Sequence, residues 1–175
     1  MTTHGSDESP RRADTESGVA SASGAGLLRR LVRGVVGGLI ATALMTLYRF
    51  PVFRALPPTS DFWAKYVGGG ATETYPGVGL VLHFLYGGVA GGLFAVLIDA
   101  LGFETEREDS LGAIALSLVY SLALSVFGTR VVFRVLLDED LDPDEAVIFH
   151  VGHVIYGLTL GTWVGFDKRT GEAYE

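Results

Sequence analysis

The fold is decided by the stretch VGLVLHFLYGGVAGGLFAVLI, residues 78–98, which carries no formal charge and ends at Asp99. An α-helix of these 21 residues is about 30 Å long, which matches the thickness of the hydrocarbon core of a bilayer. Buried helices of soluble proteins rarely stay uncharged over such a length. The stretch therefore predicts a transmembrane helix.

Three further apolar stretches support this interpretation. Two of them are also uncharged over a membrane-spanning length, whereas the first has a shorter uncharged core. We expect Arg33 and Arg49 to snorkel to the two interfaces and so to lengthen this first span. The sequence thus predicts an all-α fold, a four-helix transmembrane bundle with spans at about 27–50, 78–98, 111–129 and 146–166.

The composition agrees with a membrane protein and excludes several other classes. The 175 residues, enough for one domain, are 49% hydrophobic and have a mean hydropathy of +0.37. The net charge of −7 argues against a nucleic-acid partner, because nucleic acids are bound by basic surfaces. The chain has no cysteine, which excludes disulfides, thiolate metal sites and cysteine catalysis.

The polar ends of the chain set the expected domain organisation. Residues 1–25 offer little to bury and predict a disordered tail, residues 26–169 form the membrane domain, and residues 170–175 form a second tail. With the N-terminus inside, eight Lys and Arg residues lie in the cytoplasm and five lie outside, mainly because of the basic cluster 29–33. We therefore expect a multi-pass protein of the cell membrane with both termini cytoplasmic.

Two loops contain signals for helix starts. After the first span, Ser60 is a suitable N-cap and Gly68 a suitable end for a short helix at headgroup level, and a plain loop is the alternative. Before the fourth span, the sequence Asp142-Pro143-Asp144-Glu145 offers Asp at the N-cap, Pro at N1 and Glu at N3. The second pattern predicts a helix that begins at Pro143.

The most specific signal is an internal repeat. The pattern His-x-x-Tyr-Gly-x-x-x-Gly occurs at residues 83–91 and again at residues 153–161, 70 positions later. The pattern Val-Phe-Arg-x-Leu occurs at residues 52–56 and again at residues 132–136, 80 positions later. We infer two tandem two-helix repeats. Because each unit contains an even number of spans, both units insert in the same orientation, and the pseudo-twofold axis lies along the membrane normal.

The glycines of the repeat are expected to serve helix packing. Gly at four-residue spacing lies on one face of a helix and lets two backbones approach closely, which drives association in lipid. The predicted packing residues are Gly87, Gly91, Gly157 and Gly161.

Polar side chains of the repeat gather in one layer near the external ends of the spans. Ionisable groups at membrane depth are costly and usually face the interior of a bundle. Two interpretations follow: hydrogen bonds between helices, or a polar pocket for a small solute, an ion or a lipid headgroup. The pocket residues would be His83, Tyr86, His150, His153, Tyr156, Arg54 and Arg134.

The same histidines are also candidate ligands for a cofactor. Two histidines on facing helices beside glycines would suit the axial positions of haem b, which we keep as an alternative. His83, His150 and His153 would also be candidate metal ligands, but no carboxylate lies at their depth, so we assign no metal site. Ser117, Ser121 and Ser125 form a polar seam without a catalytic arrangement around it. No catalytic constellation is found, so we expect a protein that is not an enzyme.

The first span and the loop after it resemble the opening of YagU-like inner-membrane proteins. The resemblance rests on the pattern Gly34-x-x-Gly37-Gly38-x-x-Ala41-x-x-Leu44-Met45, followed by Pro57-Pro58 and Trp63. The paired His-x-x-Tyr-Gly spans resemble related families of small prokaryotic four-span membrane proteins of uncharacterised function. The likeness covers residues 27–166, implies a four-span membrane protein and supplies no catalytic residues.

Three functional hypotheses remain open from the sequence. The first is a membrane protein with the polar pocket described above, which could also assist proton-linked transport. The second is a bis-His haem protein in electron transfer. The third is a structural or assembly partner without a ligand. Expected partners are the lipid bilayer and either a second copy of the chain or another membrane protein. Four spans are few to enclose a path for a solute, which favours oligomerisation.

Overall fold

A computed structural model describes residues 9–52, 57–101 and 110–165, and all regular elements in these ranges are helical. The order is α1 (Ser9–Val52), α2 (Pro58–Trp63), the π-helical turn η1 (Ala64–Gly68), the 3-10 turn η2 (Thr72–Thr74), α3 (Pro76–Ala100), α4 (Ser110–Phe127), the π-helix η3 (Gly128–Leu137) and α5 (Pro143–Gly165).

Four helical segments are long and apolar enough to cross a membrane. They are Gly24–Pro51, Pro76–Ala100, Leu111–Leu137 and Pro143–Gly165. Each is longer than or as long as the roughly 20 residues that a hydrocarbon core requires. The prediction of an all-α protein with four spans is therefore confirmed at the level of length and composition. The third helical segment continues through η3 to Leu137, beyond the expected end at residue 129.

The first helix is much longer than expected from its apolar core. It begins at Ser9, inside the segment 1–25 for which a disordered tail was expected. A helix that is already nucleated by an apolar span extends at little cost into neighbouring residues, because each added residue gains one hydrogen bond. Pro10 is the second residue of this helix and is compatible with such a start, because the first N–H groups of a helix have no partner within it. The second expected tail, residues 170–175, and residues 1–8 lie outside the described part.

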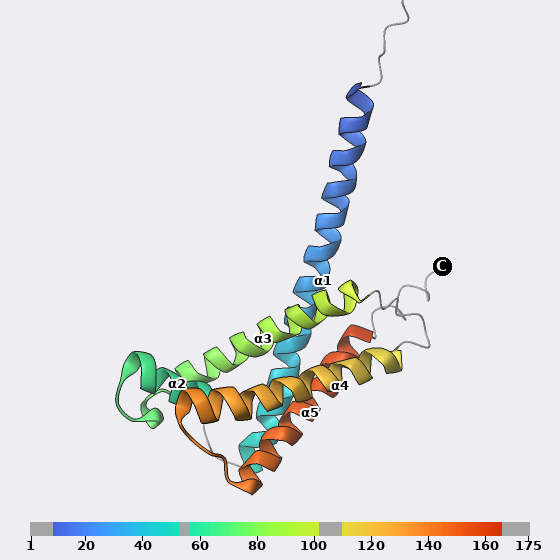
Figure 1. Ribbon diagram of the computed structural model, residues 1–175. Helices are drawn as coiled ribbons and strands as arrows, with labels where there is room; N and C mark the ends of the chain where they lie inside the picture. Colours follow the sequence, from blue (N-terminus) through green and yellow to red (C-terminus); the bar gives the residue numbers. More distant parts are fainter. Residues whose placement is uncertain (1–8, 53–56, 102–109, 166–175) are drawn as a thin grey trace, which may run out of the picture.

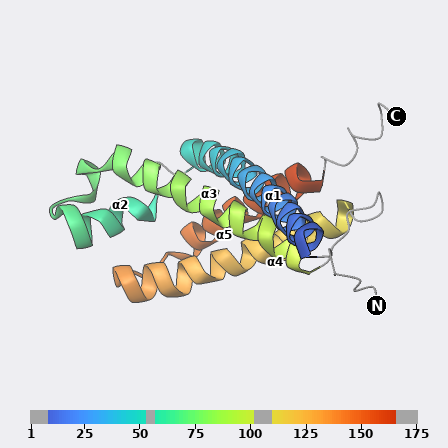
Figure 2. The ribbon, with the colours of Figure 1, turned by 90° about the horizontal axis from the view of Figure 1, so that it is seen from above.

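The helices pack in two closely apposed pairs, α1 with α3 and α4 with α5, and α1 also lies along α5 (Figure 1). α1 crosses α3 in both views (Figure 2), and in Figure 1 it then continues well beyond the other helices. Contact between α3 and α4 is sparse: the Tyr120 hydroxyl donates to the Ala90 carbonyl at 2.9 Å, and the rings of Phe94 and Tyr120 are 5.3 Å apart.

Small residues allow the close approach within each pair. A Cβ at Gly91 of α3 would lie 2.7 Å from the Cα of Gly38 on α1, which is backbone and cannot give way. A Cβ at Gly161 of α5 would lie 2.7 Å from the Cα of Ile114 on α4. Since burial of apolar area gains little in lipid, this close backbone packing is the main contact that can hold the pairs together.

The bundle has two ends, which are named here by their residues. At the arginine end, Arg30 of α1 forms an ion pair with Asp99 of α3, and Arg33 donates to the Trp163 carbonyl of α5 at 2.7 Å. At the α2 end, Lys65 donates to the Leu137 carbonyl at 2.7 Å and so ties the loop after α1 to the end of η3.

The loops follow the sequence signals in part. The short helix α2 exists, but it begins at Pro58, so Ser60 lies inside it and is buried instead of capping it. The turn continues as η1 to Gly68, and Gly69 with a φ of 67° ends it. α5 begins at Pro143 as predicted, and the Asp142 amide donates to the Glu145 carboxylate at 3.4 Å.

Candidate functional site

A small cavity lies inside the bundle toward the α2 end. Its volume is about 20 Å³. That is enough for about one water molecule, which occupies at least roughly 10–15 Å³ by this measure. We call it the His–Tyr cavity; it is lined by Thr42, Met45, His83, Tyr86, Gly87, Leu124, His153 and Tyr156. Four of the seven predicted pocket residues therefore meet around one space: both histidines and both tyrosines of the repeat.

His153 is the better fixed of the two histidines. Its side chain is 6% exposed, and its Nδ1 lies 2.9 Å from the Phe149 carbonyl one turn earlier on α5. A carbonyl oxygen only accepts, so Nδ1 carries the proton. In the neutral ring Nε2 is then an acceptor. The Phe149 ring packs against the imidazole at a centroid distance of 4.5 Å.

His83 reaches the same cavity from α3 and is held more loosely. Its side chain is only partly buried, and no described residue forms a hydrogen bond with its ring. The site therefore contains one imidazole whose tautomer is fixed by a hydrogen bond, that of His153, and one whose tautomer is not fixed in this way, that of His83. A neutral imidazole can both donate and accept a hydrogen bond, so either ring has the chemistry to bind a water molecule.

The two tyrosines are not equivalent, although the repeat predicts that they should be. Tyr156 is 3% exposed and donates its hydroxyl to the Gly87 carbonyl at 2.7 Å, which links α5 to α3. Tyr86 is 41% exposed and lies at the margin of the cavity. The difference follows from the packing. Tyr156 lies on α5, which packs against both α1 and α4, whereas Tyr86 lies on α3, which packs against α1 but makes few contacts with α4.

Threonine and glycine shape the wall between α1 and α3. A Cβ at Gly87 would collide with the Thr42 hydroxyl oxygen, so no larger residue fits there without moving α1. The Thr42 hydroxyl itself donates to the Gly38 carbonyl at 2.8 Å, one turn earlier on α1. The lining residues Thr42, Met45 and Leu124 were not among the sequence candidates, and no motif distinguished them from other core positions.

The cation beside the site is Arg49, at the end of α1. Its charge acts on both His83 and His153, and the charges of Glu145 and Asp61 act on it in turn. These two carboxylates come from the first turn of α5 and from α2. Arg49 thus interacts electrostatically both with the acidic residues of the α2 end and with the two histidines. The sequence showed Arg49 only as a residue that ends the first span.

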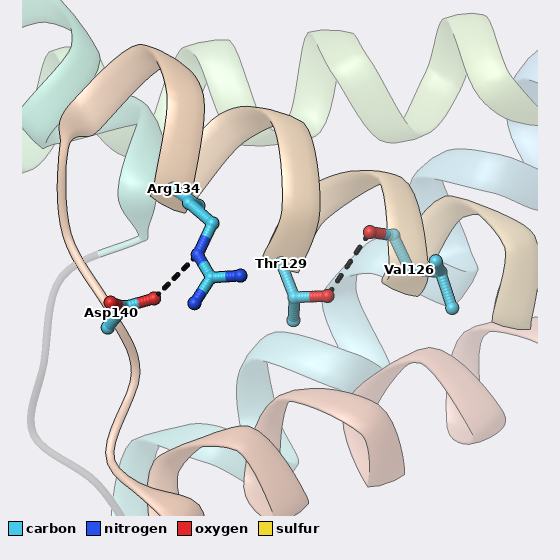
Figure 3. A network of polar contacts seen from close by, with 4 residues as sticks. All are labelled: Val126, Thr129, Arg134 and Asp140. Carbon is cyan, nitrogen blue, oxygen red and sulfur yellow. Dashed lines mark hydrogen bonds and ion pairs between the residues drawn. The ribbon is translucent and has the colours of Figure 1, made fainter.

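Arg134, one of the two arginines predicted for the pocket, does not line the cavity. Arg134 is exposed, and its Nε donates to the Asp140 carboxylate at 3.0 Å (Figure 3). Figure 3 shows Arg134 extending from η3 toward the following loop, beside Thr129, whose hydroxyl donates to the Val126 carbonyl. The buried side of η3 is occupied by Phe133 and Leu137, which leaves Arg134 outside. Arg54 lies outside the described residues.

His150 also stays apart from the His–Tyr cavity. Its Nδ1 lies 2.7 Å from the hydroxyl of Ser125, a fully buried residue of α4. This contact joins α4 to α5, so His150 follows the first of the two interpretations given for the histidines, a hydrogen bond between helices. Ser117 and Ser121 are likewise fully buried on α4 and face the glycines of α5. The serine seam is therefore part of the α4–α5 contact.

The described side chains around the cavity do not form a metal site and leave little room for haem. Within the described ranges, no group of three or more His, Cys, Asp or Glu side chains is arranged to hold a metal ion. A haem needs room for a macrocycle between its two axial histidines, but the space between His83 and His153 has a volume of only about 20 Å³. The arrangement of these residues does not fit the haem alternative.

These features define the class of the protein: an all-α, multi-pass membrane protein with a water-sized cavity inside its bundle, lined in part by histidines and tyrosines. No family model, no curated protein and no solved structure matches the chain. The likeness to YagU-like proteins therefore rests on the sequence pattern alone.

Proposed function

We propose that the protein is a non-enzymatic membrane protein whose activity is to bind and release protons at the His–Tyr cavity, with a water molecule as the bound ligand. The observation that carries the proposal is that His83 and His153, from different helices, line one water-sized space. Histidine is the side chain whose charge changes most readily near neutral pH, which makes it the usual proton carrier in proteins. Ionisable groups at membrane depth often mark functional sites, and proton relays are among these sites.

The charged residues of the α2 end give this site a connection to the aqueous phase. The charge of Arg49 acts on both histidines, and the carboxylates Glu145 and Asp61 act on Arg49, so a change of charge in the cavity is coupled to groups at the α2 end. In the low dielectric of a bundle interior such charges interact strongly. We propose that protons cross the bundle by way of the cavity and that they enter or leave it through the α2 end.

Reconstituted vesicles with a trapped pH dye test this proposal. A rapid change of external pH should produce proton movement with the wild-type protein and much less with His83→Gln or His153→Gln. His150→Gln is the matched control, because His150 is bound to Ser125 and does not line the cavity. Equal proton movement in all three variants would refute the proposal. Thermal unfolding of each variant separates loss of function from loss of fold, and destabilisation without a proton signal would favour a scaffold role.

We also propose that the bundle arose from two tandem repeats. Thr42 contacts Gly87 in the first pair, and Ser121 contacts Gly157 in the second, at positions 79 and 70 residues apart. The Val-Phe-Arg-x-Leu pattern recurs at an offset of 80, one residue more. A π-helix accommodates one inserted residue in an α-helix, and η3 begins at Gly128, after Ser121, and contains the second copy of that pattern. One residue inserted in η3 would then account for the increase of the offset from 79 to 80.

We further propose an orientation in the membrane, a partner and a relationship to a known family. The basic cluster at the arginine end favours that end as the cytoplasmic one, so that both termini are cytoplasmic and the His–Tyr cavity lies nearer the external side. Four spans enclose little space, which favours a homo-oligomer or another membrane protein as partner. We propose a relationship with the YagU-like proteins on the pattern of the first span.

A further inference from the structure

A second hollow lies on the outer surface of the bundle, apart from the His–Tyr cavity. It is an open groove of about 530 Å³ between α1 and α5. Its lining residues are Leu44, Leu158, Thr159, Thr162 and Trp163. The volume is in the range of ordinary ligand sites, which measure about 300–1,000 Å³. The groove is independent of the proposed proton site.

The surroundings of the groove limit what can occupy it. Both of its helices are candidate membrane spans, so the groove opens toward the hydrocarbon of the bilayer. Leu44 and Leu158 are each 44% exposed there. The Thr159 hydroxyl is already used, since it donates to the Ile155 carbonyl at 2.8 Å. An apolar chain is therefore the chemistry that this surface accepts.

One end of the groove is closed by a tryptophan held against an arginine. The indole of Trp163 lies over Gly37, where a Cβ would be only 2.5 Å from its Cδ1 atom. The Trp163 Nε1 donates to the Arg33 carbonyl at 3.3 Å, and Arg33 Nη2 donates to the Trp163 carbonyl at 2.7 Å. The guanidinium of Arg33 is thereby fixed at the end of an apolar groove.

Arg29 adds a second positive charge at this end. It lies one turn before Arg33 on α1, is exposed, and is close enough for its charge to act on Arg33. Within the described part of the chain Arg29 has no ion pair, whereas Arg30 is paired with Asp99. From Gly37 to Leu44 the groove follows α1 for about 10 Å, at 1.5 Å per residue. A cationic end on an apolar channel of this length matches a phospholipid.

We propose that this groove binds one acyl chain of an anionic phospholipid whose phosphate is held by Arg29 and Arg33. A second copy of the chain fits less well as occupant. In one membrane, a symmetric copy would bring its own Arg29 to the same level, and like charges would then face one another. An anionic headgroup instead places a negative charge beside Arg29, for which the described part of the chain holds no ion pair.

Fluorescence quenching by brominated lipids tests the proposal directly. The chain has two tryptophans, so Trp63→Phe leaves Trp163 as the sole reporter in the groove. The protein is reconstituted in neutral phosphatidylcholine vesicles that contain a small fraction of brominated phosphatidylglycerol or brominated phosphatidylcholine. We expect the association constant from quenching to be at least about tenfold higher for the anionic lipid. Arg29→Gln should lower this preference about fivefold, which is the usual contribution of one surface arginine.

Two further variants make the result specific. Thr162→Phe, which fills the groove, should reduce quenching by the anionic lipid. Arg130→Gln, an exposed arginine at the α2 end, should leave the preference unchanged and is the matched control. Equal quenching by both lipids, or a preference that survives Arg29→Gln, would overturn the proposal. Weak quenching by both lipids that increases as the protein is diluted in the membrane would also overturn it, in favour of a second copy.

Discussion

Replacing Gly91 by Ala should destabilise the bundle more than its small size implies. The new Cβ would lie 2.7 Å from the Cα and 2.8 Å from the N of Gly38, and ordinary contacts begin at 3.4 Å. The Gly34 carbonyl oxygen would be closer still, so the axes of α1 and α3 must separate locally by at least about 0.7 Å, the difference between 3.4 and 2.7 Å. All three contact atoms belong to the backbone, so no rotation of a side chain relieves the clash.

The cost of this separation can be bounded. A gap of 0.5–1 Å removes roughly a quarter to a half of each dispersion contact across an interface. Overpacking in well-packed cores costs about 1–3 kcal/mol. The better helix propensity of Ala returns up to about 1 kcal/mol. We therefore expect the free energy of unfolding to fall by about 1–2 kcal/mol, which is roughly a 5- to 30-fold change in the unfolding equilibrium.

Reversible unfolding in mixed micelles measures this change. Gly77→Ala on the same helix is the control, since a Cβ there meets nothing within 4 Å. The control should be neutral or slightly more stable than the wild-type protein. If Gly91→Ala and Gly77→Ala unfold at the same denaturant concentration, the reasoning about backbone contact between α1 and α3 is wrong.

Three further predictions concern other contacts. Tyr156→Phe leaves the Gly87 carbonyl without its donor and should cost about 0.6 kcal/mol, the average for interhelical hydrogen bonds in membranes, whereas Tyr86→Phe should cost much less in the same unfolding assay. Arg134→Gln should change neither stability nor proton movement, because its ion pair with Asp140 is exposed; a loss of proton movement would return Arg134 to the site. Topology reporters should read cytoplasmic at the C-terminus and external near Gly69, and the opposite pattern would invert the assigned orientation.

Some features were predictable because they depend on local sequence alone. The lengths of the uncharged stretches indicate four spans, and the order Asp142-Pro143 indicates the start of α5. Spacing of four residues also identified Gly91 and Gly161, which the structure places in backbone contact with the partner helices. In each case a single helix carries the whole signal, so no knowledge of its neighbours was needed.

The composition of the site was less predictable because it depends on which helices meet. Depth in the membrane can be counted along one span, and on that basis Arg134 was placed in the layer of the histidines. Direction around the helix axis depends on packing, and Phe133 and Leu137 take the inner side of η3. Arg49 became part of the site because α1 covers both α3 and α5. Nothing in the local sequence of Arg49 indicates that contact.

The central claim is that His83 and His153 share one hydrated cavity, and solid-state NMR of the protein in bilayers tests it most directly. With ¹⁵N-labelled histidine, of which the chain has four, the ring nitrogens can be assigned and their contacts with water measured. We predict water contacts at both His83 and His153, with the proton of neutral His153 on Nδ1. Contacts of the His83 ring with lipid chains and none with water would contradict the claim, as would a proton on Nε2 of neutral His153.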